Sequence, residues 1–147
     1  METSQSKWLL LVYKIPREPT VHRVAIWRKL KQLGALLLQD AVWVLPWTPQ
    51  THEHFQWLAA EINELGGEST VWLSELESPA KRAELAKKFS AKVDEDYKNI
   101  LSQLRKKNPD LSALARRYQH AVAQDYFHSK LGEKVRKALL SKGGNSP

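Results

Sequence analysis

A continuous apolar run near the N-terminus constrains the fold of this chain more than any other feature. The run covers nine residues, Lys7 to Ile15, and is followed by Pro16 and Pro19. Its length is too short to span a membrane, and it suits a strand buried on both faces better than a helix. Because such a strand needs hydrogen-bonded neighbours, we expect a sheet whose first strand is this run.

The next segments alternate between helical and strand-like patterns. Residues 20–33 carry an apolar stripe at helical spacing, with Thr20 as the expected N-cap and Gly34 as the stop. Residues 35–38 and 41–45 are short apolar runs on either side of a two-residue polar turn. This arrangement predicts a helix followed by a hairpin.

A second helix and a fourth strand complete the pattern. Thr48 and Pro49 have the character of an N-cap and a first helical residue, and apolar residues recur at helical spacing as far as Leu65, before Gly66-Gly67. Residues 70–76 alternate as a strand. The order strand, helix, strand, strand, helix, strand is that of ferredoxin-like folds.

Beyond Pro79 the sequence becomes helical. Apolar residues step by three and four from Ala86 to Leu104, Pro109 interrupts the pattern, and Asp110 is the expected cap of a further helix. A last helix is expected to end at Gly143-Gly144. We therefore predict an α+β protein with one domain over residues 1–147, in which a ferredoxin-like βαββαβ sheet (1–77) precedes a basic helical extension (78–147).

Charge divides the chain into two compositional parts. Residues 1–77 hold seven lysines and arginines against nine aspartates and glutamates, whereas residues 78–147 hold sixteen against seven. The net charge of +7 therefore comes from the second part. A positive field concentrated in one part of a protein indicates a partner rich in phosphates or other anions.

The apolar residues of the first part raise the question of what covers the sheet. All six tryptophans lie between residues 8 and 72. Core packing is expected for those on strands and helix stripes, whereas the exposure of Trp47, in a loop between two prolines, stays open. The first strand is apolar on both faces, yet a four-stranded sheet of this topology has helices on one face only. We expect either the C-terminal helices or a second subunit to cover the other face, because a monomer rarely exposes so large an apolar patch.

Several kinds of site lack support in the composition. The chain has no cysteine, which excludes disulfides, thiolate metal sites and a cysteine nucleophile. His52 and His54 are two residues apart, so on a helix their side chains diverge by about 200° and cannot share a metal. The polar start Met1–Gln5 does not resemble a signal peptide. We expect a cytoplasmic binding protein that spans no membrane, holds no metal or cofactor and is not an enzyme.

Four segments resemble the N-terminal domain of the chromate-resistance regulator family ChrB. They are Trp8 to Pro16, Arg23 to Ala35, Ala41-Val-Trp-Val-Leu-Pro46 and Arg116 to Phe127. The resemblance extends over most of the chain. It implies a bacterial transcriptional regulator of chromate resistance in which this domain binds DNA and forms a homodimer, while a second, C-terminal domain is associated with chromate sensing.

Clustered lysines and arginines are the residues expected to contact DNA phosphates. The first helix offers Arg23, Arg28, Lys29 and Lys31. The second part offers Arg105, Lys106, Lys107, Arg116, Arg117, Lys130, Lys134, Arg136 and Lys137. No helix-turn-helix signature with a convincing recognition helix is present, so phosphate contact is expected before base contact.

Other interpretations of the same residues stay open. Each basic cluster could be an ordinary solvated helical face, and the domain could be an interaction or oligomerisation module without DNA binding. Arg23 beside His22, and the pair Arg116-Arg117, could bind chromate or another oxyanion. A weaker likeness of the topology points to PaaX-type repressors and to ferredoxin-like nucleases of CRISPR systems. The nuclease family's metal-binding aspartate is missing at the end of the first strand, where Val12-Tyr13-Lys14 stands.

Overall fold

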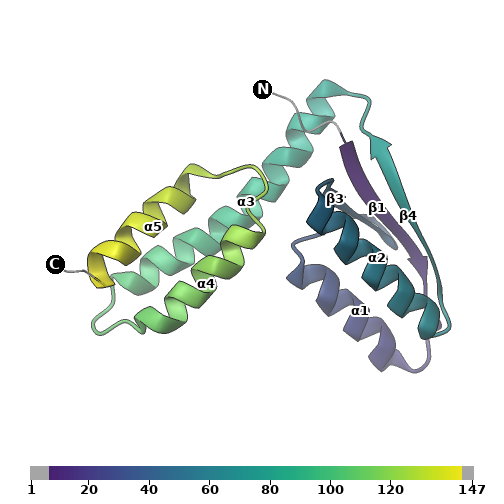
Figure 1. Ribbon diagram of the computed structural model, residues 1–147, viewed down its shortest axis with the longest axis horizontal. Helices are drawn as coiled ribbons and strands as arrows, with labels where there is room; N and C mark the ends of the chain where they lie inside the picture. The colour runs from purple at the N-terminus through teal and green to yellow at the C-terminus, as the bar shows by residue number, and fades with distance from the viewer. Residues whose placement is uncertain (1–6, 144–147) are drawn as a thin grey trace. The chain divides into compact units, whose positions relative to one another are not determined.

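The computed structural model describes residues 7–143, which divide into two compact units, with the boundary along the chain between Arg82 and Ala83 (Figure 1). The first unit contains β1 (Lys7–Lys14), α1 (Thr20–Gln32), β2 (Leu36–Gln39), β3 (Val42–Pro46), α2 (Pro49–Glu64) and β4 (Glu68–Glu75). α3 (Pro79–Leu104) runs through the boundary, and the second unit also contains α4 (Leu111–Ala123) and α5 (Lys130–Gly143). The polar start and the expected stop at Gly144 lie outside the described residues. The single domain over residues 1–147 stays a prediction.

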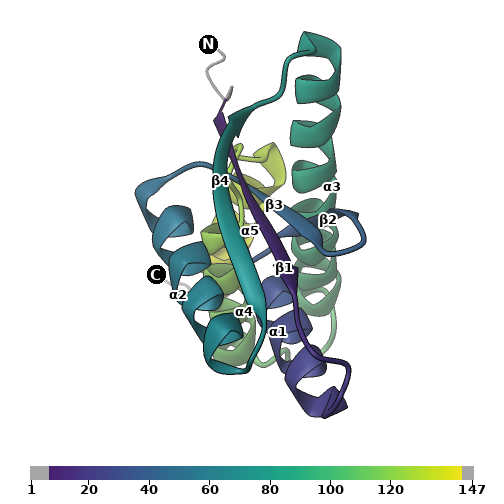
Figure 2. The ribbon, with the colours of Figure 1, turned by 90° about the vertical axis from the view of Figure 1, so that its right-hand side faces the viewer.

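The first unit is an antiparallel sheet with α1 and α2 on the same face (Figures 1 and 2). Its strands are ordered β2-β3-β1-β4, and Leu9 of β1 lies opposite Leu45 of β3 and Leu73 of β4. The predicted order of strands and helices is confirmed. The core of this unit is formed between helices and sheet by buried side chains that include Leu9, Leu11, Ile26, Leu30, Trp43, Leu45, Phe55 and Ile62.

Local signals account for most of the element boundaries. The Thr48 side chain accepts a hydrogen bond from Thr51 N, and the Thr51 side chain accepts one from Thr48 N, which together cap α2. Gly34 has a φ of 80°, the left-handed conformation that ends α1. The expectation for Thr20 was wrong by one residue. Pro19 is the N-cap of α1, and the Thr20 side chain makes no capping hydrogen bond because it is already helical.

The tryptophans depart furthest from expectation. Trp8 and Trp43 are buried, but Trp27, Trp57 and Trp72 expose 49%, 64% and 55% of their surface. Trp27 follows the buried Ile26 by one residue, and one residue turns a helical side chain by about 100°, away from the buried stripe. The prediction of core packing was therefore wrong for these three tryptophans. Trp47, whose exposure the sequence left open, exposes 38% of its surface.

The second face of the sheet is unevenly exposed. Trp8 and Val44 on this face are buried, whereas Trp72 on the edge strand β4 is exposed. What covers this face, expected to be the C-terminal helices or a second subunit, stays a prediction.

The second unit packs the larger part of α3 with α4 and α5 (Figure 1). Asp110 caps α4 as predicted, because its side chain accepts a hydrogen bond from Ala113 N. The expected α3 stripe is present, except that Leu85 rather than Ala86 is buried at its start. The common core consists of Val93, Tyr97, Ile100, Leu104, Leu114, Ala121 and Val135. Among residues 7–143, no helix is long and apolar enough to cross a membrane.

A polar network joins α3 to the loop before α5. The Tyr97 hydroxyl donates to Asp125 Oδ2 at 2.8 Å, and Ser129 N donates to Asp125 Oδ1 at 2.9 Å. The Ser129 hydroxyl in turn donates to Asp94 of α3. Burial, and after it the hydrogen bond to Asp125, raises the pKa of Tyr97 above its ordinary value. Tyr97 is therefore held as a neutral donor that ties the loop to α3.

Candidate functional site

The basic side chains of α4 lie along a groove between α4 and α3. Arg117 donates to Asn99 Oδ1 of α3 at 2.6 Å, and Arg116 donates to Ser112 Oγ at 3.0 Å. Both arginines, with Asp96 and His120, line a groove of about 340 Å³. These hydrogen-bond partners are uncharged and do not offset the two guanidinium charges, so the groove holds two arginines beside the carboxylate of Asp96.

The turn between α3 and α4 extends this positive surface. Lys106 and Lys107 line a second groove, of about 260 Å³, and Arg117 lines both grooves. All four basic side chains are exposed. We refer to Lys106, Lys107, Arg116 and Arg117 as the α3–α4 basic face. The structure thus brings together two of the clusters predicted from the sequence, which lie about ten residues apart in the chain. Arg105 is also exposed but lines neither groove.

The basic residues of α5 are less uniform than the sequence indicated. Lys130, Lys134 and Lys137 are exposed. Arg136 forms an ion pair with Glu133, with Nε and Nη2 at 3.1 and 2.5 Å from the two carboxylate oxygens. The hydrogen bond from Arg136 lowers the pKa of the Glu133 carboxyl. Glu133 therefore offsets much of the charge that Arg136 would present to a phosphate.

The basic residues of α1 separate into different roles. Lys29 forms an ion pair with Glu61 of α2 at 2.7 Å, and Lys31 lies 5.6 Å from the ring centre of Trp27. Arg28 is exposed. α1 belongs to the first unit, whereas the α3–α4 basic face belongs to the second unit.

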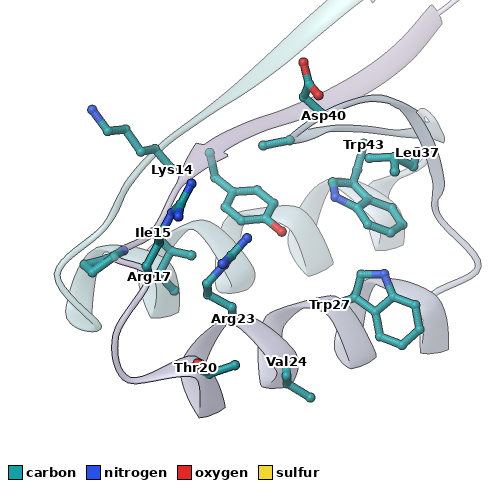
Figure 3. A pocket seen from close by; sticks show the side chains of 13 residues that line it. Lys14, Ile15, Arg17, Thr20, Arg23, Val24, Trp27, Leu37, Asp40 and Trp43 are labelled. Atoms are coloured by element: carbon teal, nitrogen blue, oxygen red, sulfur yellow. The ribbon is translucent and has the colours of Figure 1, made fainter.

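Arg23, the remaining α1 candidate, lines a groove of about 880 Å³ beside the sheet (Figure 3). The groove is also lined by Tyr13, Lys14, Ile15, Pro16, Arg17, Thr20, Val24, Trp27, Leu37, Asp40, Ala41 and Trp43. From the sequence we expected Arg23 to bind an anion beside His22, but His22 is not among the lining residues. Lys14 and Arg17 were missed. Their positions at the end of the first strand and in the loop after it were the available signal.

Tyr13 occupies the wall of this groove and is half-buried. Burial raises the pKa of its hydroxyl, while a hydrogen bond with Trp43 and the charge of Arg23 partly oppose the increase. A half-buried aromatic hydroxyl that lines the same groove as a guanidinium group is the kind of polar group that orients a bound ligand.

The histidines and carboxylates give no sign of a metal centre in the described part of the chain. Among residues 7–143, no three histidine, aspartate or glutamate side chains form a cluster that could hold a metal ion.

Comparison with known proteins finds a family model that matches the part of the chain carrying these surfaces. The family model described as "Protein ChrB, N-terminal" matches residues 23–138. A protein named ChrB from Cupriavidus metallidurans is 35% identical over 69 residues. That alignment covers 47% of this chain and 21% of the relative. The match to the family model includes both the α3–α4 basic face and Arg23.

Proposed function

Because this chain belongs to the ChrB N-terminal family, we propose that it is the DNA-binding part of a transcriptional regulator of chromate resistance. Binding, without catalysis, is the proposed role, and a regulator of this kind would act in the bacterial cytoplasm. The aligned part covers only 21% of the ChrB relative, so chromate responsiveness is also a proposal for this chain. The strand order β2-β3-β1-β4 with antiparallel pairing supports a ferredoxin-like assignment of the first unit.

The observation that carries this proposal is the α3–α4 basic face. Its four cations are exposed, and Arg116 and Arg117 are held by uncharged partners on a helical scaffold. Each phosphate that a cation neutralises releases condensed counterions, so such a face supplies affinity that falls as salt rises. We propose that these four residues contact phosphates, with the lysines of α5 adding to the field.

Fluorescence anisotropy of a labelled promoter duplex tests the proposal. The full chain is titrated at about 50 and 200 mM salt, with a scrambled duplex in parallel. Loss of two phosphate contacts lowers the slope of log affinity against log salt by about 1.8. Between about 50 and 200 mM salt, the affinity of the unaltered chain should therefore fall about tenfold more than the affinity of the double variant Arg116→Gln/Arg117→Gln.

A matched control removes the same charge elsewhere in the second unit. Lys87→Gln/Lys88→Gln replaces two exposed lysines of α3 that line neither groove. The control should keep a salt slope close to that of the unaltered chain. Absence of salt-sensitive binding, or an equal reduction in both double variants, would contradict the assignment of the α3–α4 basic face.

A second candidate function is self-association through β4. This strand lies at the edge of the sheet and pairs with β1 on one side only. Its exposed Trp72 and Leu73 make it a template for another strand. An antiparallel pairing centred on Trp72 would keep every side chain on its own face and place Val71 opposite Leu73 of the second copy.

Sedimentation velocity of the full chain tests this second candidate. A dimer is expected for the unaltered chain, and Trp72→Lys should convert it to a monomer because two like charges would lie directly opposite each other at the pairing centre. Trp57→Lys is the control, since Trp57 is also exposed but lies on α2. A monomeric unaltered chain, or loss of the dimer only in the Trp57 variant, would refute pairing through β4.

A further inference from the structure

The groove beside α1 has the size of a site for a small organic molecule. Its volume of about 880 Å³ lies within the range of ligand pockets, roughly 300–1,000 Å³. The end of β1, the loop after it, α1 and the β2–β3 turn all contribute to its walls. An inorganic oxyanion would occupy only a small part of this space, so a larger ligand fits it better.

The two ends of the groove differ in chemistry. Figure 3 shows Arg17 and Arg23 at one end and Trp27, Leu37 and Trp43 at the other. The cationic end can hold a carboxylate, because guanidinium groups form paired hydrogen bonds to its two oxygens. The aromatic end can hold a flat ring by stacking or edge contact.

Exposure supports a ligand at the aromatic end. Trp27, Val24 and Leu37 expose 49%, 37% and 50% of their surface, and all three line this groove. Exposed apolar side chains that gather at one place mark a binding site more often than scattered ones do. Lys31 lies over the ring of Trp27, which helps to fix its orientation.

The charges of the lining residues select the sign of the ligand. The residues that line the groove include three cations, Lys14, Arg17 and Arg23, but only one carboxylate, that of Asp40. In Figure 3 the Asp40 carboxylate points away from Arg17 and Arg23. The cationic end is therefore available to an anion.

We propose that this groove binds a planar aromatic carboxylate, with its carboxylate against Arg17 and Arg23 and its ring against Trp27. This site goes beyond the proposed DNA-binding role and does not depend on it, because its lining residues all belong to the first unit. Tyr13 also lines the groove, and its hydroxyl can add a hydrogen bond to the ligand.

Nuclear magnetic resonance of the full chain, labelled with ¹⁵N, provides the test, with 2-naphthoate as the probe. Each of the six indole N–H groups gives its own signal, so the signals of the groove tryptophans report binding at the groove itself. Saturable shifts are expected for Trp27 and Trp43, with none for Trp57, which lies on α2 outside the groove. Absence of shifts at Trp27 and Trp43 would overturn the proposal.

Substitutions distinguish specific binding of the probe in the groove from non-specific attraction to the protein surface. Arg23→Gln and Trp27→Leu should each weaken binding by about tenfold, the effect of losing one charge-assisted hydrogen bond or one ring contact. Both residues are exposed, so these substitutions leave the core intact. Their matched controls, Arg28→Gln and Trp57→Leu, should leave the affinity unchanged. Equal weakening by variants and controls would overturn the proposal.

Two further probes define the ligand class. The neutral alcohol 2-naphthylmethanol should bind at least tenfold more weakly than 2-naphthoate, and equal binding would overturn the role of the cations. Inorganic phosphate should displace the probe only at far higher concentration. Displacement at equal concentration would make the groove an inorganic-oxyanion site and would overturn the aromatic part of the proposal.

Discussion

Replacing Gly132 with alanine tests how closely α5 packs against α3. Gly132 is buried within α5, and a Cβ atom at this position would lie 2.9 Å from the Tyr97 hydroxyl oxygen and 3.0 Å from Cζ of its ring. The distance to the oxygen is shorter than real Cβ atoms show, and the distance to Cζ is tighter than nine in ten real Cβ contacts, so the ring or the helix must move. Tyr97 is fully buried and bonded to Asp125, which leaves its ring little freedom to yield.

Three contributions determine the size of the effect. Alanine favours a helix over glycine by about 1 kcal/mol. Overpacking a core position costs about 1–3 kcal/mol. Displacing the Tyr97 hydroxyl from the Asp125 carboxylate would remove a hydrogen bond that contributes roughly 1.5–3 kcal/mol. The steric and hydrogen-bond losses outweigh the gain in helix propensity, and we expect Gly132→Ala to lower the free energy of unfolding by about 3 kcal/mol.

Urea unfolding followed by far-UV circular dichroism measures this change in the helices. Gly143→Ala is the matched control, because Gly143 belongs to the same helix and a Cβ atom there meets nothing within 4 Å. The control should be unchanged or slightly more stable. In a Tyr97→Phe background the cost of Gly132→Ala should shrink, since the atom nearest to the new methyl group is absent. Equal stability of the two glycine variants would refute the packing argument.

Two further predictions concern the cap of α2 and the alkaline stability of the second unit. Thr51→Val should destabilise the first unit by about 2 kcal/mol in unfolding monitored by tryptophan fluorescence. The buried Thr51 hydroxyl donates to Pro46 O at 2.7 Å and accepts from Thr48 N at 2.8 Å, and valine loses both hydrogen bonds. Unchanged stability would contradict the cap. Burial raises the pKa of Tyr126 from 10.0 to about 12, so its neutral form stabilises the folded state fully below about pH 10, and this contribution is lost as pH rises towards 12. Tyr126→Phe should therefore make the unfolding free energy less sensitive to pH in this window, and an unaltered pH dependence would contradict the shift.

Local patterns in the sequence were sufficient to predict the order of helices and strands. Helical spacing, strand alternation and capping residues such as Thr48, Gly34 and Asp110 act within a few neighbouring residues, so they can be read without knowing the fold. Counts of charged residues located the net positive charge in the second part of the chain. The local patterns failed for the exposed tryptophans, because an apolar residue beside a buried stripe can still point outwards.

The candidate sites depended on tertiary structure. Arg117 meets Asn99 across 18 residues of sequence, and Lys29 meets Glu61 across 32, so only the folded chain distinguishes a cation with an uncharged partner from one already paired with a carboxylate. Likewise, the groove joins the end of β1, the start of α1 and the β2–β3 turn. The sequence by itself determined which elements form and where charge accumulates, because those depend on local spacing and composition. Which side chains share a surface was decided by packing, because packing brings together residues that are distant in the chain.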